Sequence, residues 1–254
     1  TVSATDVRAL EITRLDAALF DLPPGFTETS SVVDLAPSLG TIDPTGINPI
    51  ARNKVPGAEF FFRTDTGERI KMVAWFGTDG LGRDIYSRVV YGARVSLLVG
   101  VAVALLSVVC GLFFGLLAGF FRLLDAVIMR IMDGLMAIPA ILLAIAMVSL
   151  FRSSVWTVII AITVPQVPGV VRLVRSIVLS VREEPYVEAA VTLGTSTPKL
   201  LWRHVLPNTI APMIVQGTFI CASAILIEAI LSFLGIGVPP EIPTWGNIMA
   251  EGRQ

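Results

Sequence analysis

The stretch "SLLVGVAVALLSVVCGLFFGLLAGFF" (residues 96–121) contains no charged residue. A helix rises 1.5 Å per residue, so about 20 apolar residues cross the roughly 30 Å of hydrocarbon in a bilayer. Small residues recur at spacings of three and four, which places them on one face of a helix: Gly100, Ala104, Ser107, Gly111, Gly115 and Gly119. Because such a face lets another helix approach closely, the stretch predicts a membrane span packed against a second helix.

The composition of the whole chain also indicates a membrane protein. Of the 254 residues, 54% are hydrophobic and 15% are charged, and the mean hydropathy is +0.77. A soluble domain usually carries about 25% charged residues. The formal net charge of -1 gives no reason to expect a nucleic-acid partner. Cys110 and Cys221 both lie inside apolar runs, which suits buried apolar side chains better than a disulfide or a metal site.

Three further apolar runs follow the first, and we expect spans at about 128–151, 155–181 and 209–237. Pro139 falls inside the second run and predicts a kinked span, since membrane helices tolerate proline where neighbours satisfy the freed carbonyl. The predicted fold class is therefore an all-α polytopic membrane protein. Its bundle of transmembrane helices occupies residues 76–254.

Residues 1–75 differ from the rest, because no apolar run there is long enough to span a bilayer. Clusters of Pro, Gly and Asp predict a loop-rich segment outside the membrane. Two β-prone runs flank "TDTGE" in "FFFRTDTGERIKMVAWF", which predicts a β-hairpin. The chain starts at Thr1 without a signal peptide and ends on "AEGRQ" without a closing element, so we expect a fragment truncated at both ends.

The charged segment between the third and fourth runs predicts the orientation of the chain. Basic residues in short loops favour the cytoplasmic side of a membrane. The loop between the second and third runs offers only Arg152. The segment between the third and fourth runs carries Arg172, Arg175, Arg182, Lys199 and Arg203. We therefore expect residues 183–207 in the cytoplasm, with residues 1–95 and the "VPPEIPTWGN" tail outside.

That segment, "EEPYVEAAVTLGTSTPKLLWRHVLPN" (residues 183–208), predicts two short helices joined by a glycine turn. Pro185 suits a first helical turn, and Gly194 suits a C-terminal cap with positive φ. Thr197 is expected to cap the second helix, with Pro198 at its first position and Pro207 at its end. The simplest alternative is an ordinary interfacial loop whose helices lie on the membrane surface.

Each helix of the segment is expected to have an apolar face and a charged face. On the first, Val187, Ala190 and Val191 share one face, and Glu184 and Glu188 share another. On the second, the apolar stripe consists of Leu200, Leu201, His204 and Val205. Lys199 and Arg203 lie beside that stripe.

Three ordered motifs resemble one family. Glu188, Ala189, Ala190, then Gly194 and a later "LPN", resemble the "EAA" loop of ABC-importer permeases. The stretch "FGTDGLGRDIYSRVVYGARVSL" resembles the segment that precedes the permease core in the dipeptide, oligopeptide and nickel subfamily. The stretch "AILIEAILSFLGIGVPPEIPTWGNIM" resembles a later span of that subfamily and its outer loop. Together the motifs cover about residues 76–254.

The resemblance implies a permease subunit of an ATP-driven importer in the bacterial cytoplasmic (inner) membrane. Peptides are the commonest solutes of such importers, and the sequence does not distinguish them from nickel or another solute. It implies that the loop docks as a coupling helix on cytoplasmic ATPase subunits, which bind ATP and Mg²⁺, so this chain needs no cofactor. Further implied partners are a second homologous permease subunit, an extracytoplasmic solute-binding protein and membrane lipid. The coupling residues carried over are Glu188, Ala189, Ala190, Gly194 and Pro207; Lys199 and Arg203 are expected to pair with acidic groups of the ATPase.

Glu228 in "ILIEAILSF" supports a rival hypothesis. A carboxylate is costly inside a membrane and often functional, as in a proton-coupled carrier. No relay partner or inverted repeat is evident in the sequence, so we favour a structural or gate-lining role for Glu228. Gln166 and Gln216 are further candidates for the pathway or gate. A membrane scaffold without transport activity is a third hypothesis.

An enzyme is the least favoured class, and we expect no catalytic residue and no metal ligand. "GTSTPK" lacks the second glycine and the final hydroxyl of a phosphate-binding loop, and His204 is the only histidine. "GTDGLGRD" favours a turn closed by ion pairs among Asp79, Arg83 and Asp84 over a phosphate site. Such a turn is expected to shape the outer entrance of the first span.

Overall fold

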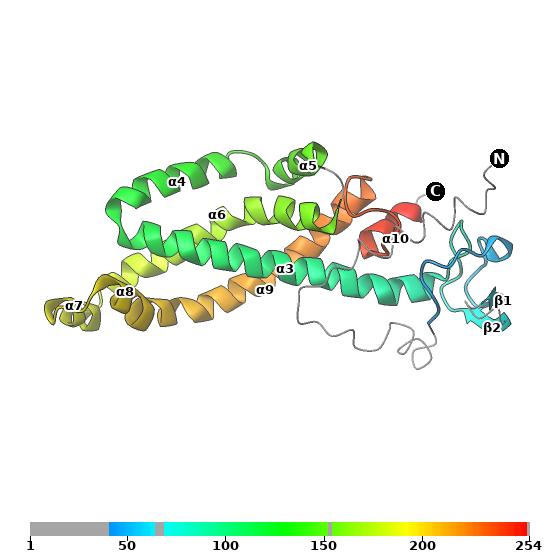
Figure 1. Cartoon of the computed structure of the whole chain (residues 1–254), viewed down its shortest axis with the longest axis horizontal. Helices are drawn as coiled ribbons and strands as arrows, with labels where there is room; N and C mark the ends of the chain where they lie inside the picture. The colour runs from blue at the N-terminus through cyan, green and yellow to red at the C-terminus, as the bar shows by residue number, and fades with distance from the viewer. Residues whose placement is uncertain (1–40, 64–68, 152–153, 253–254) are drawn as a thin grey trace, which may run out of the picture. The chain divides into compact units, whose positions relative to one another are not determined.

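The computed structural model describes residues 41–63, 69–151 and 154–252. The chain divides into two compact units, Thr1–Ile42 and Asp43–Gln254, and the fold described below is that of the second unit. The expected loop-rich residues 1–40, the hairpin turn at 64–68 and Arg152 lie outside the described residues. The elements, labelled in Figure 1, are η1 Pro49–Ala51, β1 Ala58–Arg63, β2 Arg69–Ala74, α3 Ile85–Phe120, α4 Arg122–Met136, α5 Ala140–Leu150, α6 Val155–Arg182, α7 Pro185–Thr192, α8 Thr197–Leu200, the π-helix η2 Leu201–Val205, α9 Leu206–Phe233 and α10 Trp245–Glu251.

Long apolar helices dominate the second unit, which confirms the predicted all-α membrane fold. Among the described residues, three helical stretches are long and apolar enough to cross a membrane: α3, α6 and Thr197–Phe233. The pair α4 and α5 adds a fourth if it forms one broken span. The predicted hairpin is also confirmed, because β1 and β2 pair antiparallel with Phe60 opposite Met72.

The glycine face of α3 is where the bundle is packed most closely. Gly111, Gly115 and Gly119 each meet one valine of α6: Val170, Val174 and Val178. A Cβ added at Gly115 would lie only 2.5 Å from the Cβ of Val174. Further along α3, Gly100 meets Cys221 and Ile225 of α9. The predicted close approach of a second helix is confirmed, and α3 packs along both α6 and α9 (Figure 1).

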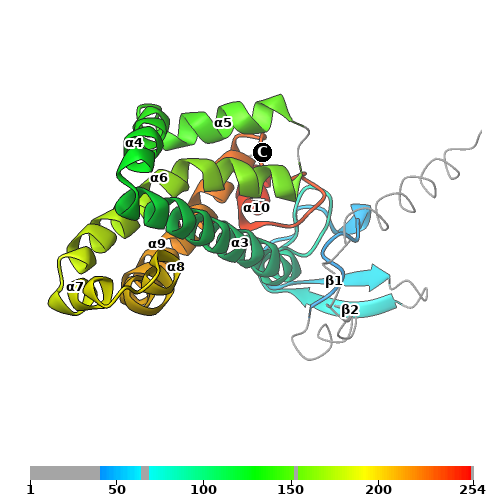
Figure 2. The same cartoon turned by 60° about the vertical axis from the view of Figure 1, so that its left-hand side comes forward.

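Pro139 breaks the second run instead of kinking it. α4 ends at Met136 and α5 begins at Ala140, with Pro139 as its N-cap and an angle of 88° between the two helices. The turn is clear in Figure 2. Proline has no N–H to donate and pushes the residue before it out of the helical conformation, so one continuous helix is lost. The predicted kinked span at 128–151 was therefore wrong in its geometry.

Two helix ends also differ from the expected spans. α3 begins at Ile85, well before residue 96, because the Asp84 carboxylate accepts a 2.9 Å hydrogen bond from Ser87 N–H. A hydropathy pattern cannot detect this polar first turn. α9 ends at Phe233, because Gly235 adopts φ +78° and Ile236 N–H bonds to the Leu231 carbonyl. The compact unit also begins at Asp43, whereas the sequence placed a boundary at 75/76.

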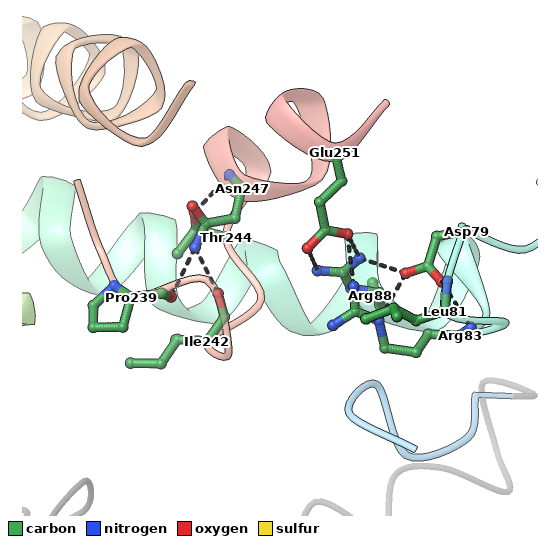
Figure 3. A network of polar contacts seen from close by, with 9 residues as sticks. All are labelled: Asp79, Leu81, Arg83, Arg88, Pro239, Ile242, Thr244, Asn247 and Glu251. Atoms are coloured by element: carbon green, nitrogen blue, oxygen red, sulfur yellow. Dashed lines mark hydrogen bonds and ion pairs between the residues drawn. The ribbon is translucent and has the colours of Figure 1, made fainter. Parts of the chain in front are cut away.

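α10 was not predicted, and it fastens the loop between α9 and α10 to α3 and α9. Asn247 Nδ2 donates to the carbonyls of Pro239 and Ile242, both at 2.9 Å, which holds the proline-rich loop in place (Figure 3). Trp245 Nε1 donates to the Val89 carbonyl of α3 at 3.1 Å. The loop "VPPEIPTWGN" therefore follows the end of α9 and holds α10 against α3.

Four charged side chains form a buried cluster between the start of α3 and α10 (Figure 3). Asp79 Oδ2 lies 2.7 Å from Arg83 Nε and 2.7 Å from Arg88 Nη1. Glu251 bonds both arginines from the other side. The expected Asp79–Arg83 pair is confirmed, but Asp84 caps α3, and sequence reasoning missed Arg88 and Glu251. Arg88 is 2% exposed, so the cluster is a buried contact between elements and not a solvated turn.

The close packing of α3 on α6 predicts a specific cost for one methyl group. We expect Gly115→Ala to destabilise the protein by about 1–3 kcal/mol, because the new Cβ meets Val174 and the Val171 carbonyl. Gly134→Ala on α4 is the matched control: nothing lies within 4 Å of its Cβ position. Alanine is also the better helix former there, by roughly 1 kcal/mol. Thermal unfolding in detergent measures both variants, and equal apparent midpoints would contradict the packing argument.

The charged cluster predicts a pH dependence of stability. Burial disfavours the ionised form of Asp79, but hydrogen bonds from the backbone and side chain of Arg83, and its positive charge, outweigh burial and hold the pKa of Asp79 below its ordinary value of 3.8. A lowered folded-state pKa stabilises the fold above the unfolded-state pKa, and this contribution is lost as the pH falls through the folded-state pKa. We expect Asp79→Asn to lower the unfolding midpoint at neutral pH, and the difference from the wild type to shrink below about pH 4.

The control for this pH series is Glu241→Gln, which removes an exposed carboxylate from the loop between α9 and α10. Its midpoint should follow that of the wild type at every pH. A difference for Asp79→Asn that stays constant down to about pH 3 would show that the ionised carboxylate does not stabilise the fold.

Candidate functional site

The loop between α6 and α9 forms two helical pieces with well-defined caps. α7 starts at Pro185, as expected, and is followed by Gly194 with φ +78°. Thr195 N–H bonds to the Ala190 carbonyl at 3.1 Å, and Gly194 N–H bonds to the Val191 carbonyl at 2.9 Å. These two bonds form the Schellman motif that a glycine with positive φ allows. The predicted glycine turn is thus confirmed, and it ends α7 with its last carbonyls satisfied.

The second piece continues into α9 without interruption. Its N-cap is Ser196 and not Thr197, and Pro207 does not end the helix. Residues Leu201–Val205 form a π-helix, in which Leu206 N–H bonds to the Leu201 carbonyl. Since Pro207 has no N–H and its ring clashes with the carbonyl four residues earlier, a wider turn just before it accommodates the ring. The predicted stop at Pro207 was wrong, and the second piece of the loop and α9 form one continuous helical stretch, Thr197–Phe233.

One face of the loop is anchored in the hydrophobic core. Val187, Ala190, Leu200 and Val205 are all buried and belong to the same cluster as the valines of α6. Val191, expected on this face, is 56% exposed. The stripe predicted on the second piece is confirmed, since Leu201 and His204 are half-buried beside Leu200 and Val205. This face of the loop is therefore packed on the helix bundle.

Three side chains whose contacts the sequence did not predict hold the loop in place: Tyr186, Asn208 and Arg182. The Tyr186 ring lies 6.2 Å from the His204 ring. Asn208 Nδ2 donates to the Tyr186 hydroxyl and to the His204 carbonyl. At the end of α6, Arg182 donates to the Gly119 carbonyl at 3.0 Å and lies over the ring of Phe120. The loop is thus joined to α3, α6 and α9.

The opposite face of the loop is open. Most of the predicted coupling residues lie on it as exposed side chains or glycine: Glu188, Ala189, Gly194, Lys199, Arg203 and Pro207. Ala190 points into the core instead. Leu193 and Trp202 are 86% and 76% exposed, and no periodicity in the sequence had identified them. Exposed apolar side chains among charges are typical of a protein-binding surface.

Glu228 is a buried residue of α9 near the loop between α9 and α10. One carboxylate oxygen accepts a 2.8 Å hydrogen bond from Ser232 Oγ, which in turn accepts one from Val238 N–H. Its other oxygen is buried beside the hydroxyl groups of Thr244 and Ser96. Gln166 and Gln216 are half-buried on α6 and α9. In this conformation Glu228 has no exposed surface, which favours the structural role over a solute ligand.

Two arginines used to predict the orientation lie within α6 and not in the loop. Arg172 Nη2 lies 2.6 Å from Asp133 Oδ1, and Arg175 bonds Asp125 with two nitrogens. Both acids belong to α4. Only Arg182, Lys199 and Arg203 therefore remain as the basic residues at the loop itself, and a cytoplasmic location for this end stays a prediction.

Comparisons with known proteins agree with this architecture. Residues 107–253 match the family described as "Binding-protein-dependent transport system inner membrane component". The chain is 51% identical over 229 residues to a probable peptide ABC transporter permease protein of Sinorhizobium fredii, covering 90% of this chain and 74% of that protein. It is 40% identical over 179 residues to the oligopeptide transport system permease protein OppC of Bacillus subtilis, covering 70% of this chain and 59% of that protein.

A solved structure shares the fold. "Inward facing conformations of the MetNI methionine ABC transporter" matches with a TM-score of 0.53 at 20% identity, covering 61% of this chain and 77% of that chain. The identity is too low to carry more than the fold. The family resemblance predicted from the "EAA" loop is confirmed by the sequence comparisons. The chain belongs to the family of inner-membrane components of binding-protein-dependent transport systems, which are multi-pass ABC-transporter permeases and not enzymes.

Proposed function

We propose that this chain is a permease subunit that moves peptides across the inner membrane, driven by a cytoplasmic ATPase that docks on α7 and the glycine turn. The observation that carries the proposal is the two-faced loop: Val187 and Leu200 are held in the core while Glu188 and Lys199 are exposed. A rigid element fixed at one face and free at the other can transmit rigid-body motion. Relatives named as peptide permeases support the choice of peptides as solutes.

The proposal includes further subunits. A second homologous permease subunit would complete the passage, an extracytoplasmic binding protein would deliver the solute, and the ATPase subunits would bind ATP and Mg²⁺. The family's description as binding-protein-dependent supports this assembly. Loop residues 183–207 face the cytoplasm in this proposal, and residues 1–95 face the outside. The comparisons support neither a proton-coupled carrier that uses Glu228 nor a scaffold without transport activity.

Charge reversal at Glu188 tests the docking. We expect Glu188→Lys to weaken association with the ATPase by at least about tenfold, or roughly 1.4 kcal/mol, because the new positive charge would face the basic group with which the exposed Glu188 carboxylate is proposed to pair. ATP-driven peptide uptake should fall with it. Glu183→Lys, an equally exposed reversal just before α7, is the matched control and should retain both. Copurification and uptake in membrane vesicles are the measurements, and equal results for both variants would refute docking through α7.

The glycine turn offers a second test, which leaves the charges unchanged. Nothing lies within 4 Å of a Cβ at Gly194, so a substitution there acts only through its φ of +78°. A β-branched residue resists this conformation, whereas asparagine tolerates it better. We expect Gly194→Val to uncouple ATP hydrolysis from uptake and Gly194→Asn to retain most of the coupling. If Gly194→Val stayed fully coupled, the rigid turn would not be needed for transmission.

A further inference from the structure

Glu228 is fully buried near the end of α9, where α10 packs across α9 and α3. It lies about 7.5 Å before the end of its helix at 1.5 Å per residue. A Cβ added at Gly246 of α10 would lie 2.7 Å from the Cα of Ala229 on α9. One added at Gly92 of α3 would lie 3.3 Å from the carbonyl carbon of Thr244. The buried carboxyl group is therefore near a helix end and next to a closely fitted short helix.

Three hydroxyl groups lie against this carboxyl group. Ser232 Oγ of α9 donates a 2.8 Å hydrogen bond to Glu228 Oε1. The other carboxyl oxygen is buried beside the hydroxyls of Thr244 and Ser96. Ser96 belongs to α3, and Thr244 is the N-cap of α10. Glu228 thus connects α3, α9 and α10 at one point.

Each of the three hydroxyls also binds one backbone N–H of the segment 238–247. The oxygens accept these bonds at 3.1 to 3.3 Å: Ser232 Oγ from Val238 N–H, Thr244 Oγ1 from Asn247 N–H and Ser96 Oγ from Trp245 N–H. A hydroxyl oxygen that accepts an N–H keeps its own proton to donate. The Glu228 carboxyl group is an acceptor beside all three, so it favours the orientation in which they bind the segment.

Stability alone does not favour a carboxyl group at this position. Burial of such a group away from water is strongly unfavourable unless a cation or a full set of hydrogen bonds compensates. In the described part of the chain no basic side chain pairs with Glu228. Replacing buried ionic groups by apolar residues of similar volume is often neutral or stabilising. A carboxyl group regains its hydration when water reaches it, so Glu228 reduces the free-energy cost of uncovering this site.

We propose that α10 and the segment 238–244 form a lid over Glu228 that opens and closes during transport, and that Glu228 is the positioning residue of this lid. With the lid closed, the carboxyl group orients the three hydroxyls. With the lid open, water replaces them. The inference rests on the proposed function only for the statement that the movement accompanies transport. Leucine at position 228 would fill the same space but would gain nothing from water, so it would keep the lid closed.

Hydrogen exchange tests the lid in the assembled transporter. Because three N–H groups of the segment 238–247 bond to the hydroxyls, their exchange with solvent reports how often the lid opens. We expect Glu228→Leu to slow this exchange by at least about tenfold and to lower ATP-driven uptake by a similar factor. The thermal unfolding midpoint should not fall. Glu228→Gln keeps a polar side chain of the same shape, and its exchange and uptake should lie between those of the wild type and the leucine variant.

Thr163→Val is the matched control for the loss of a buried polar group. Thr163 is buried in α6, and its hydroxyl donates to the Ile159 carbonyl at 2.7 Å. Valine has nearly the same size, so exchange in the segment 238–247 and uptake should both follow the wild type. Similar losses in both variants would overturn the inference, because any buried polar group would then have the same effect.

The outcomes for Glu228→Leu separate the inference from the proposed function. Faster exchange with a lower unfolding midpoint would overturn the inference, because Glu228 would then only hold the segment in place. Unchanged exchange, or slower exchange with undiminished uptake, would also overturn it. Hydrogen exchange needs no transport, so slower exchange in the leucine variant of a transporter that shows no ATP-driven uptake would reject the proposed function and retain the lid.

Discussion

The contact between the glycines of α3 and the valines of α6 determines the rest of the structure. Gly111, Gly115 and Gly119 let the two backbones approach so closely that a single Cβ would clash. In lipid there is no hydrophobic force to bring helices together, so close packing of small residues has to supply the association energy. With α3 and α6 held in this way, the end of α6 at Arg182 is placed beside Phe120, and the loop between α6 and α9 begins from a fixed point.

Proline has three different effects in this chain, and each depends on what surrounds it. Pro139 separates α4 from α5 at 88°. Pro165 and Pro168 remain inside a continuous α6. Pro207 follows a π-helical turn that leaves room for its ring. Sequence can locate a proline but not the neighbours that satisfy the freed carbonyl. This explains why a kink was predicted at Pro139, where the helix breaks, and a helix end at Pro207, where the helix continues.

Local rules predicted local features well. The hairpin, the glycine turn at Gly194 and the small-residue face of α3 all follow from residue type and spacing, and all are observed. Contacts between distant residues left no such signal. Glu251 meets Arg88 across most of the chain, and α10 is held by Ser96 and Val89 of α3. Periodicity describes one element at a time, so it cannot show which elements meet.

The loop with α7 and α8 lies at one end of the bundle, and α10, which contributes Glu251 to the charged cluster, lies at the other (Figure 1). At one end α7 is fastened through Val187 and the Tyr186–His204 contact. At the other, Arg83 and Arg88 join the start of α3 to α10 through Glu251. α9 connects the two ends without a break from η2 to Phe233. Because rigid packed elements switch between arrangements and do not bend gradually, a tilt passed from α7 to the helix Thr197–Phe233 would be carried to its far end, where α10 packs against α9.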